Sequence, residues 1–159
     1  MWFVFLAGSL FFLGGETMTT DTDKKAAAVR EVEEFHQFFQ DWFTGTLPRT
    51  AQAFARFSDN LAPDFELISP RGDLLARSAL VNGLEQAHGK LPKTIKIWVR
   101  DVKVRSLGAG LWLATYEEWQ DKGDGERGRL STVVFREHAA SPNGMLWLHV
   151  HETWLPDAK

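Results

Sequence analysis

Residues 144–156, GMLWLHVHETWLP, are the stretch of sequence that decides the fold. The stretch predicts a long final β-strand, in which successive side chains point to opposite faces. One face carries two imidazoles among other side chains: Trp147, His149, His151 and Thr153. The opposite face carries Leu148, Val150, Glu152 and Trp154. Because both faces hold apolar residues, neither is simply solvated. We expect one face to line a cavity and the other to meet a second surface.

Before residue 93 the sequence pattern predicts mainly helices. Apolar side chains recur at helical spacing over residues 23–44, which predicts a long amphipathic helix. Thr22 or Asp23 can cap its start, and Gly45 can stop it. The other elements predicted here are a helix, a short strand, a turn and a helix, at residues 48–58, 64–69, 70–73 and 76–88.

From residue 93 onward the hydrophobic period shortens to that of a β-strand. Four strands are predicted, at residues 94–105, 111–121, 128–137 and 145–155. Their connections are short and rich in turn-forming residues, which indicates an antiparallel meander. Helices followed by a meander are the order of an α+β fold. We therefore expect one domain over residues 21–159, with three N-terminal helices on a cone-shaped, curved antiparallel sheet.

The composition excludes several classes of function. The net charge is -3 and no basic run occurs, so the sequence does not predict nucleic-acid binding. The chain has no cysteine, which rules out disulfides and thiolate chemistry. Lack of cysteine fits a reducing compartment, and we expect a cytoplasmic protein.

The first residues, MWFVFLAGSLFFLGG, are apolar but too few to cross a bilayer as a helix. No Lys or Arg precedes them, and a signal-peptide cleavage site is poorly formed. Two interpretations stay open: translation starts at Met18, or residues 1–17 are a weak export signal or anchor. In either case residues 1–20 are a leader outside the fold, and the folded domain needs no membrane.

Three segments carry a resemblance to a known family. They are APDFELISPRG at residues 62–72, GRLSTVVF at residues 128–135 and the final stretch. With the order of elements, they resemble the nuclear transport factor 2-like superfamily, including its SnoaL-like domains, over about residues 25–156. The resemblance implies a cystatin-like conical fold around a pocket. It also implies that Asp64 would be a pocket acid, as in the cyclases and ketosteroid isomerases of this fold. The plainer alternative is an aspartate at the start of a strand that caps a turn. Thr153 departs from the many relatives that carry a histidine there.

His149 and His151 have the alternate spacing with which two imidazoles on a strand can bind a metal. Residues 153–159 offer no glutamate to complete such a site, although His36 on the first predicted helix could supply a third ligand. We therefore favour two hydrogen-bonded histidines and predict no metal and no cofactor.

Tyr116 and Glu118 share one face of a predicted strand, and Arg129 lies on the next strand. A carboxyl in an apolar pocket can act as a general acid or base near neutral pH. Arg129 would then pair with Glu118 or hold an anionic ligand. The alternative is a cross-strand ion pair that only fixes the register.

The sequence thus favours a domain that binds a small, largely apolar molecule. Such a domain is either an acid/base enzyme (isomerase, dehydratase or cyclase) or a non-catalytic binding or dimerisation module. The catalytic candidates are Glu118, His151 and Asp64. The ligand-binding candidates are Tyr116, Arg129, His149 and Trp147. We also expect a homodimer through an apolar stripe formed by Leu148, Val150 and Trp154.

Overall fold

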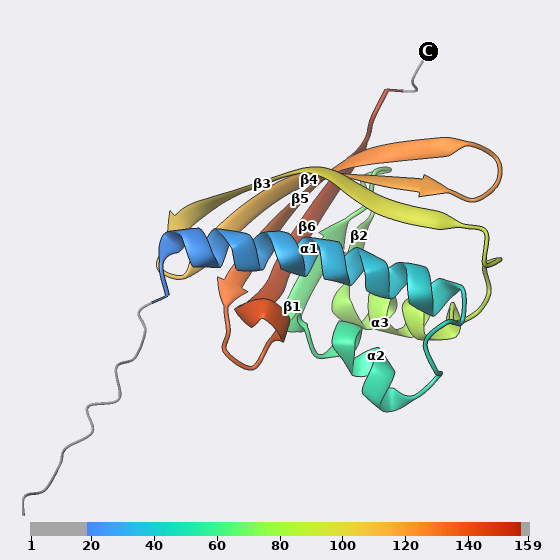
Figure 1. The fold of residues 1–159 in the computed structure, drawn as a ribbon, viewed down its shortest axis with the longest axis horizontal. Coiled ribbons are helices and arrows are strands. Elements are labelled where there is room, and N and C mark those ends of the chain that lie inside the picture. Colours follow the sequence, from blue (N-terminus) through green and yellow to red (C-terminus); the bar gives the residue numbers. More distant parts are fainter. Residues whose placement is uncertain (1–18, 157–159) are drawn as a thin grey trace, which may run out of the picture.

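The computed structural model describes residues 19–156, in which three helices are combined with a curved sheet (Figure 1). The elements are α1 (Asp21–Phe43), α2 (Ala51–Ser58), β1 (Leu61–Ile68), β2 (Leu74–Ala76), α3 (Arg77–Gln86), β3 (Lys96–Gly108), β4 (Leu111–Asp121), β5 (Glu126–Glu137), η1 (Pro142–Gly144) and β6 (Met145–Trp154). The α+β class, the three helices and the meander are confirmed. The predicted leader lies outside the described residues, except for residues 19 and 20.

The ends of α1 follow local chemistry. The Thr20 hydroxyl accepts a hydrogen bond from the Asp23 amide, and the Asp23 carboxylate accepts one from the Thr20 amide. This reciprocal capping box starts the helix two residues before the predicted boundary. The N-cap is Thr20, so the prediction that Thr22 or Asp23 caps the helix was wrong. Gly45 ends the helix as expected, with a φ of 68° that suits glycine.

The sheet has the strand order β2-β1-β6-β5-β4-β3. Strands β3 to β6 form the predicted antiparallel meander, but β1 pairs with β6 in parallel, so the sheet is mixed. A tight hairpin requires antiparallel strands, whereas β1 and β6 are joined through the whole rest of the domain. The sequence also missed β2, which forms a short hairpin with β1 across the predicted turn.

Helix α1 lies across the sheet, with α2 and α3 beneath it (Figure 1). Its buried face packs on alternate side chains of the strands, and these residues form one core. The large fully buried side chains of this core include Trp42, Trp112, Trp147 and Phe135. No helix within residues 19–156 is long and apolar enough to cross a bilayer.

A β-bulge in β6 changes which residues face the core. Val134 pairs with His149, but the next residue, Phe135, pairs with Trp147, so Leu148 is an extra residue in β6. One extra residue moves every later side chain to the opposite face. Trp147 therefore points inward, and so does Val150 three residues later.

The bulge overturns the predicted apolar stripe on the outer face. Val150 is 4% exposed and belongs to the core, whereas Trp154 at the end of β6 is 49% exposed. Leu148, Val150 and Trp154 therefore do not form one continuous outer surface.

Candidate ligand-binding site

The inner side of α1 supplies an apolar wall and one imidazole. Phe35, Phe39 and Phe43 recur at every fourth residue and line a cavity between the helix and the sheet. His36 lies beside them and is buried. Its Nδ1 lies 2.7 Å from the carbonyl oxygen of Val32, which can only accept, so Nδ1 is the donor. This bond directs the other ring nitrogen toward β4.

Strand β4 places Tyr116, Glu118 and Gln120 at alternate positions on its inner face. Arg129 is the register partner of Glu118 on β5. The Glu118 Oε1 accepts hydrogen bonds of 2.6 Å from both Gln120 Nε2 and Arg129 Nη2. The Glu118 Oε2 lies 3.1 Å from His36 Nε2. Glu118 therefore contacts three nitrogen donors from three elements.

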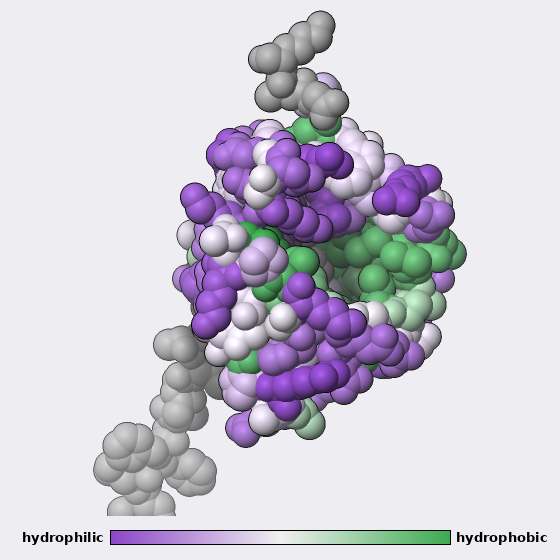
Figure 2. Space-filling model, turned by 90° about the vertical axis from the view of Figure 1, so that its right-hand side faces the viewer, coloured by the Kyte–Doolittle hydropathy of each residue, from purple (hydrophilic) through white to green (hydrophobic). Residues whose placement is uncertain are grey.

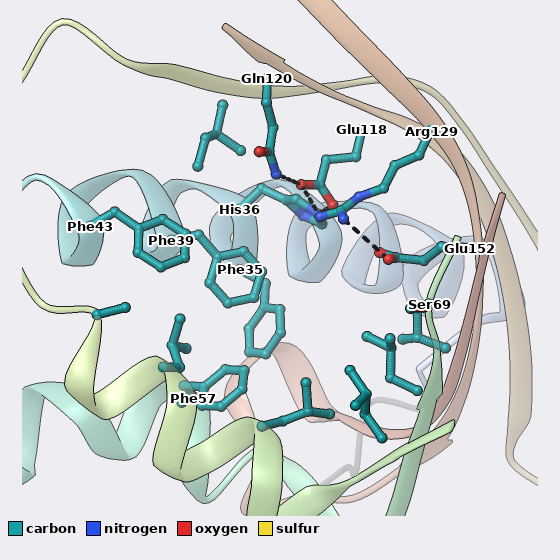
Figure 3. A pocket seen from close by; sticks show the side chains of 18 of the residues that line it. Phe35, His36, Phe39, Phe43, Phe57, Ser69, Glu118, Gln120, Arg129 and Glu152 are labelled. Atoms are coloured by element: carbon teal, nitrogen blue, oxygen red, sulfur yellow. Dashed lines mark hydrogen bonds and ion pairs between the residues drawn. The ribbon is translucent and has the colours of Figure 1, made fainter. Parts of the chain in front are cut away.

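Glu152 joins this group because of the bulge in β6. It is 6% exposed, and its Oε2 lies 3.2 Å from Arg129 Nη1. Arg129 thus lies between two carboxylates, one on β4 and one on β6. We call Glu118, Arg129, Glu152, His36 and Gln120 the polar cluster; Figure 3 shows these five side chains converging at one end of the cavity.

The cavity itself has a volume of about 560 Å³, within the usual range for small-molecule sites. Figure 2 shows an opening lined by hydrophobic residues and surrounded by hydrophilic ones. Aromatic and aliphatic side chains of α1, α2, α3, β1 and β6 form most of its wall, including Phe35, Phe39, Phe57, Leu80, Leu84 and Val150. The site is an apolar chamber with charged groups at one end.

The two carboxyls of the polar cluster differ in their electrostatics. Burial raises the pKa of Glu118, but the charges of His36 and Arg129 outweigh it and hold this pKa well below its usual range. Burial raises the pKa of Glu152 to about 7, against the opposing effect of Arg129. Burial and the Glu118 charge also raise the pKa of Tyr116 well above its ordinary value, so its hydroxyl stays protonated. Glu118 is a fixed anion, and Glu152 can change its charge near neutral pH.

Glu31 is a further buried carboxylate, but it serves the fold. It forms a two-nitrogen ion pair with Arg56, at 3.0 and 2.9 Å. Asn60 and the Trp147 indole donate to Oε1 at 2.7 and 2.8 Å, and Asn143 donates to Oε2 at 3.0 Å. Glu31 thereby joins α1 to α2, to the start of β1, to η1 and to β6.

The structure brings together four of the predicted site residues: Tyr116, Glu118, Arg129 and Trp147. Their side chains line the cavity from β4, β5 and β6. The alternation of β4 and the short connection to β5 were sufficient to place the first three. The Trp147 ring stacks on Phe35 at 4.3 Å between centroids and lies before the bulge, so its predicted direction was correct.

His149, His151 and Asp64 do not join them. The prediction that both histidines face the cavity is wrong, because the bulge at Leu148 reverses the alternation beyond it. His151 is exposed and His149 is half-buried outside the cavity lining. Asp64 is also exposed and does not line the cavity. Residues 19–156 contain no group of three or more His, Cys, Asp or Glu residues able to hold a metal.

Sequence reasoning did not assign three members of the polar cluster to this site, and it considered His36 only as a metal ligand. Gln120 continues the alternation of Tyr116 and Glu118, so the two-residue period of β4 was sufficient to predict that it shares their face. His36 lies in the apolar stripe of α1, and only the packing of α1 on β4 gives it a carboxylate partner. Glu152 was assigned to the opposite face, and no local pattern in the sequence indicated the bulge.

Comparison with known proteins gives both a family match and a fold match. The profile of the family described as "Sucrose-6-phosphate phosphohydrolase C-terminal" matches residues 28–156. Among curated proteins, sucrose-phosphatase 2 of Nicotiana tabacum is 28% identical over 130 residues, which cover 80% of this chain and 31% of that protein. The chain thus spans about a third of the length of these curated relatives, which include two of Nicotiana tabacum and one of Arabidopsis thaliana.

Solved structures share the fold. An NTF-2 like protein of unknown function from Pseudomonas aeruginosa has a TM-score of 0.72 and 27% identity, with 82% of this chain and 99% of that chain covered. The CaMKII hub of S. rosetta has a TM-score of 0.63 and 15% identity, with 82% and 95% covered. At 15% identity, the similarity to the S. rosetta hub shows a shared fold and nothing more. The predicted superfamily is confirmed at this level, whereas the family profile is not that of the SnoaL-like domains.

Proposed function

The chain belongs to the sucrose-6-phosphate phosphohydrolase C-terminal family, and we propose that it is a domain that binds a small, largely apolar molecule. The cavity with its polar cluster is the observation that supports this proposal. Large apolar walls with a few convergent polar groups are typical of ligand sites. The curated relatives are named for a sucrose phosphate, but aromatic and aliphatic walls suit a molecule less polar than a sugar. We therefore propose that the ligand of this domain is a molecule other than sucrose phosphate.

An acid/base enzyme is the second candidate, favoured by Glu152. Its carboxyl lines the cavity, and burial raises its pKa to about 7, where it can both give and take a proton. Glu118 was the sequence candidate for this role, but its three donors stabilise the anion. In an enzyme of this kind Glu152 would transfer the proton, and the protonated Tyr116 hydroxyl and Arg129 would stabilise an oxyanion.

Filling the cavity tests the proposed function. Gly83 on α3 lines the cavity, and a Cβ built there meets no heavy atom within 4 Å. We expect Gly83→Phe to weaken binding of Nile red, a neutral apolar dye, by about tenfold or more, because the ring takes up space at the cavity. Dye fluorescence in a titration measures this affinity.

The matched control is Gly83→Ala, which adds a single methyl group. It should keep the dye affinity and raise the free energy of unfolding by about 0.5–1 kcal/mol, because alanine favours the helix. Failure of the wild-type protein to bind the dye, with no molecule co-purifying in native mass spectrometry, would contradict the proposed function.

We also propose that the outer face of the sheet is a homodimer interface. The helices lie on the other side of the sheet in Figure 1. Leu113 and Val134 are opposite one another in the register, Leu130 is 41% exposed, and Trp119 stacks with Trp98 on the same face. An apolar surface of this kind is seldom left in water. Hub domains with the same fold, such as that of S. rosetta, support self-association as a use of the fold.

A charge within this apolar patch should prevent dimer formation. Leu113→Glu is expected to reduce the mass measured by sedimentation from that of two chains to that of one, because the carboxylate would be buried without a partner. Leu107→Glu is the control, since Leu107 is an exposed apolar residue close to the β3–β4 turn. A monomeric wild type at high micromolar concentration would rule out this interface.

A further inference from the structure

The side chains that line the cavity include more basic groups than acidic ones. Lys90 and Lys122 line it together with Arg129 and His36, whereas the carboxylates are Glu118 and Glu152. A ligand that enters the cavity therefore meets more basic than acidic side chains.

Three of the roughly four acceptor sites of the Glu118 carboxylate are already occupied. Both of its oxygens contact donors within the domain, from Arg129, Gln120 and His36. His36 Nδ1 donates to the Val32 carbonyl oxygen, and this bond directs Nε2 at the Glu118 carboxylate. The Arg129 guanidinium, 2.6 Å from Oε1, balances the Glu118 charge within the cluster.

Of the two carboxyls in the polar cluster, Glu152 has fewer neighbouring groups that could balance its negative charge. It shares Arg129 with Glu118, and its 3.2 Å contact with Arg129 Nη1 is longer than the 2.6 Å contact between Arg129 Nη2 and Glu118. The groups that face it are Arg129 from β5, Glu118 and Tyr116 from β4 and His36 from α1, with Lys90 and Lys122 farther along the lining. A buried carboxyl in this position is stabilised most by protonation or by a polar interaction with a ligand group.

We propose that the cavity binds an apolar monocarboxylate, whose carboxylate lies at Arg129 Nη1 and accepts a hydrogen bond from the protonated carboxyl of Glu152. This proposal rests on the proposed function and names the ligand class. The apolar body of the ligand lies against the phenylalanines of α1, and its charge lies in the polar cluster (Figure 3). Charge-assisted bonds to a buried guanidinium are the strong ones, which favours an anion over a neutral head group.

The proposed complex links binding to a proton. The ligand stays ionised above about pH 6, because free carboxyls titrate near pH 4. Burial raises the pKa of Glu152 to about 7, so the free site is mostly protonated below pH 7 and mostly ionised above it. Binding then takes up one proton above pH 7, and the affinity falls by about tenfold for each further pH unit. Below pH 7 the affinity is nearly constant.

Three probes with the same apolar body test this proposal: decanoate, decanol and decylamine. Calorimetric titration at pH 6 should give decanoate the highest affinity, about tenfold above decanol, and decylamine the lowest. Between pH 6 and pH 8 the affinity for decanoate should fall about tenfold, while that for decanol stays unchanged. Glu152→Gln should keep the preference for decanoate and remove its pH dependence, because the amide donates a hydrogen bond at every pH.

Several outcomes would overturn the proposal. Tighter binding of decylamine, equal binding of decanol and decanoate, or decanoate binding that does not weaken from pH 6 to pH 8 would each do so. If Nile red binds and Gly83→Phe blocks it, these outcomes reject the ligand class and leave the proposed function standing. If neither the dye nor any of the three probes binds, the proposed function fails as well.

Discussion

Glu31→Ala is expected to lower the free energy of unfolding by about 3–5 kcal/mol, the usual cost of removing one partner from a buried ion pair. Arg56 would lose both of its carboxylate contacts, and the donors of Asn60 and Trp147 would be left without an acceptor. Unsatisfied buried donors each carry a desolvation cost. Urea denaturation followed by tryptophan fluorescence measures the change.

Glu33→Ala is the matched control, because Glu33 is an exposed glutamate on the same helix. It should change the free energy of unfolding by no more than about 0.5 kcal/mol. Glu31→Gln should lie between the two, since the amide oxygen still accepts from Trp147 but the charge that holds Arg56 is lost. Equal stability of the two alanine variants would show that Glu31 does not join the elements as described.

Arg129→Ala is the second substitution with a large expected effect, again about 3–5 kcal/mol. It removes the one guanidinium between Glu118 and Glu152 and leaves the two buried carboxyls facing each other. It should also abolish preferential binding of decanoate. His151→Ala is the control on the neighbouring strand, and the exposed position of His151 predicts a change within about 0.5 kcal/mol.

The loss in Arg129→Ala should depend on pH. Arg129 lowers the pKa of Glu152, so its removal raises that pKa above the value of about 7. A carboxyl whose pKa is raised in the folded state stabilises the fold at low pH, and this stability is lost as the pH rises through the folded pKa. The deficit should therefore be larger at pH 8 than at pH 6. Adding Glu152→Gln should restore part of the stability, and a double-mutant cycle measures the coupling. A deficit that does not change with pH would contradict the pairing of Arg129 with Glu152.

The sequence by itself determined the main helices and strands, though not β2, and much of one wall of the site. Apolar residues at helical spacing specified α1, and the period of two specified β3 to β6. The short β4–β5 connection, together with the alternation of β4, placed Tyr116, Glu118 and Arg129 on one face. These features depend on side chains close in sequence, so local periodicity and turn chemistry are sufficient to predict them.

Only the tertiary structure decided the rest of the polar cluster. His36 and Glu118 are separated by 82 positions, and their pairing requires α1 to pack on β4. The single extra residue at Leu148 turned Glu152 into the cavity and His151 out of it. Alternation predicts that two residues point to opposite faces, but it does not say which face is buried once a bulge intervenes. That choice follows from the contacts of β6 with β5 and β1, which come from distant parts of the chain and leave no local pattern in the sequence.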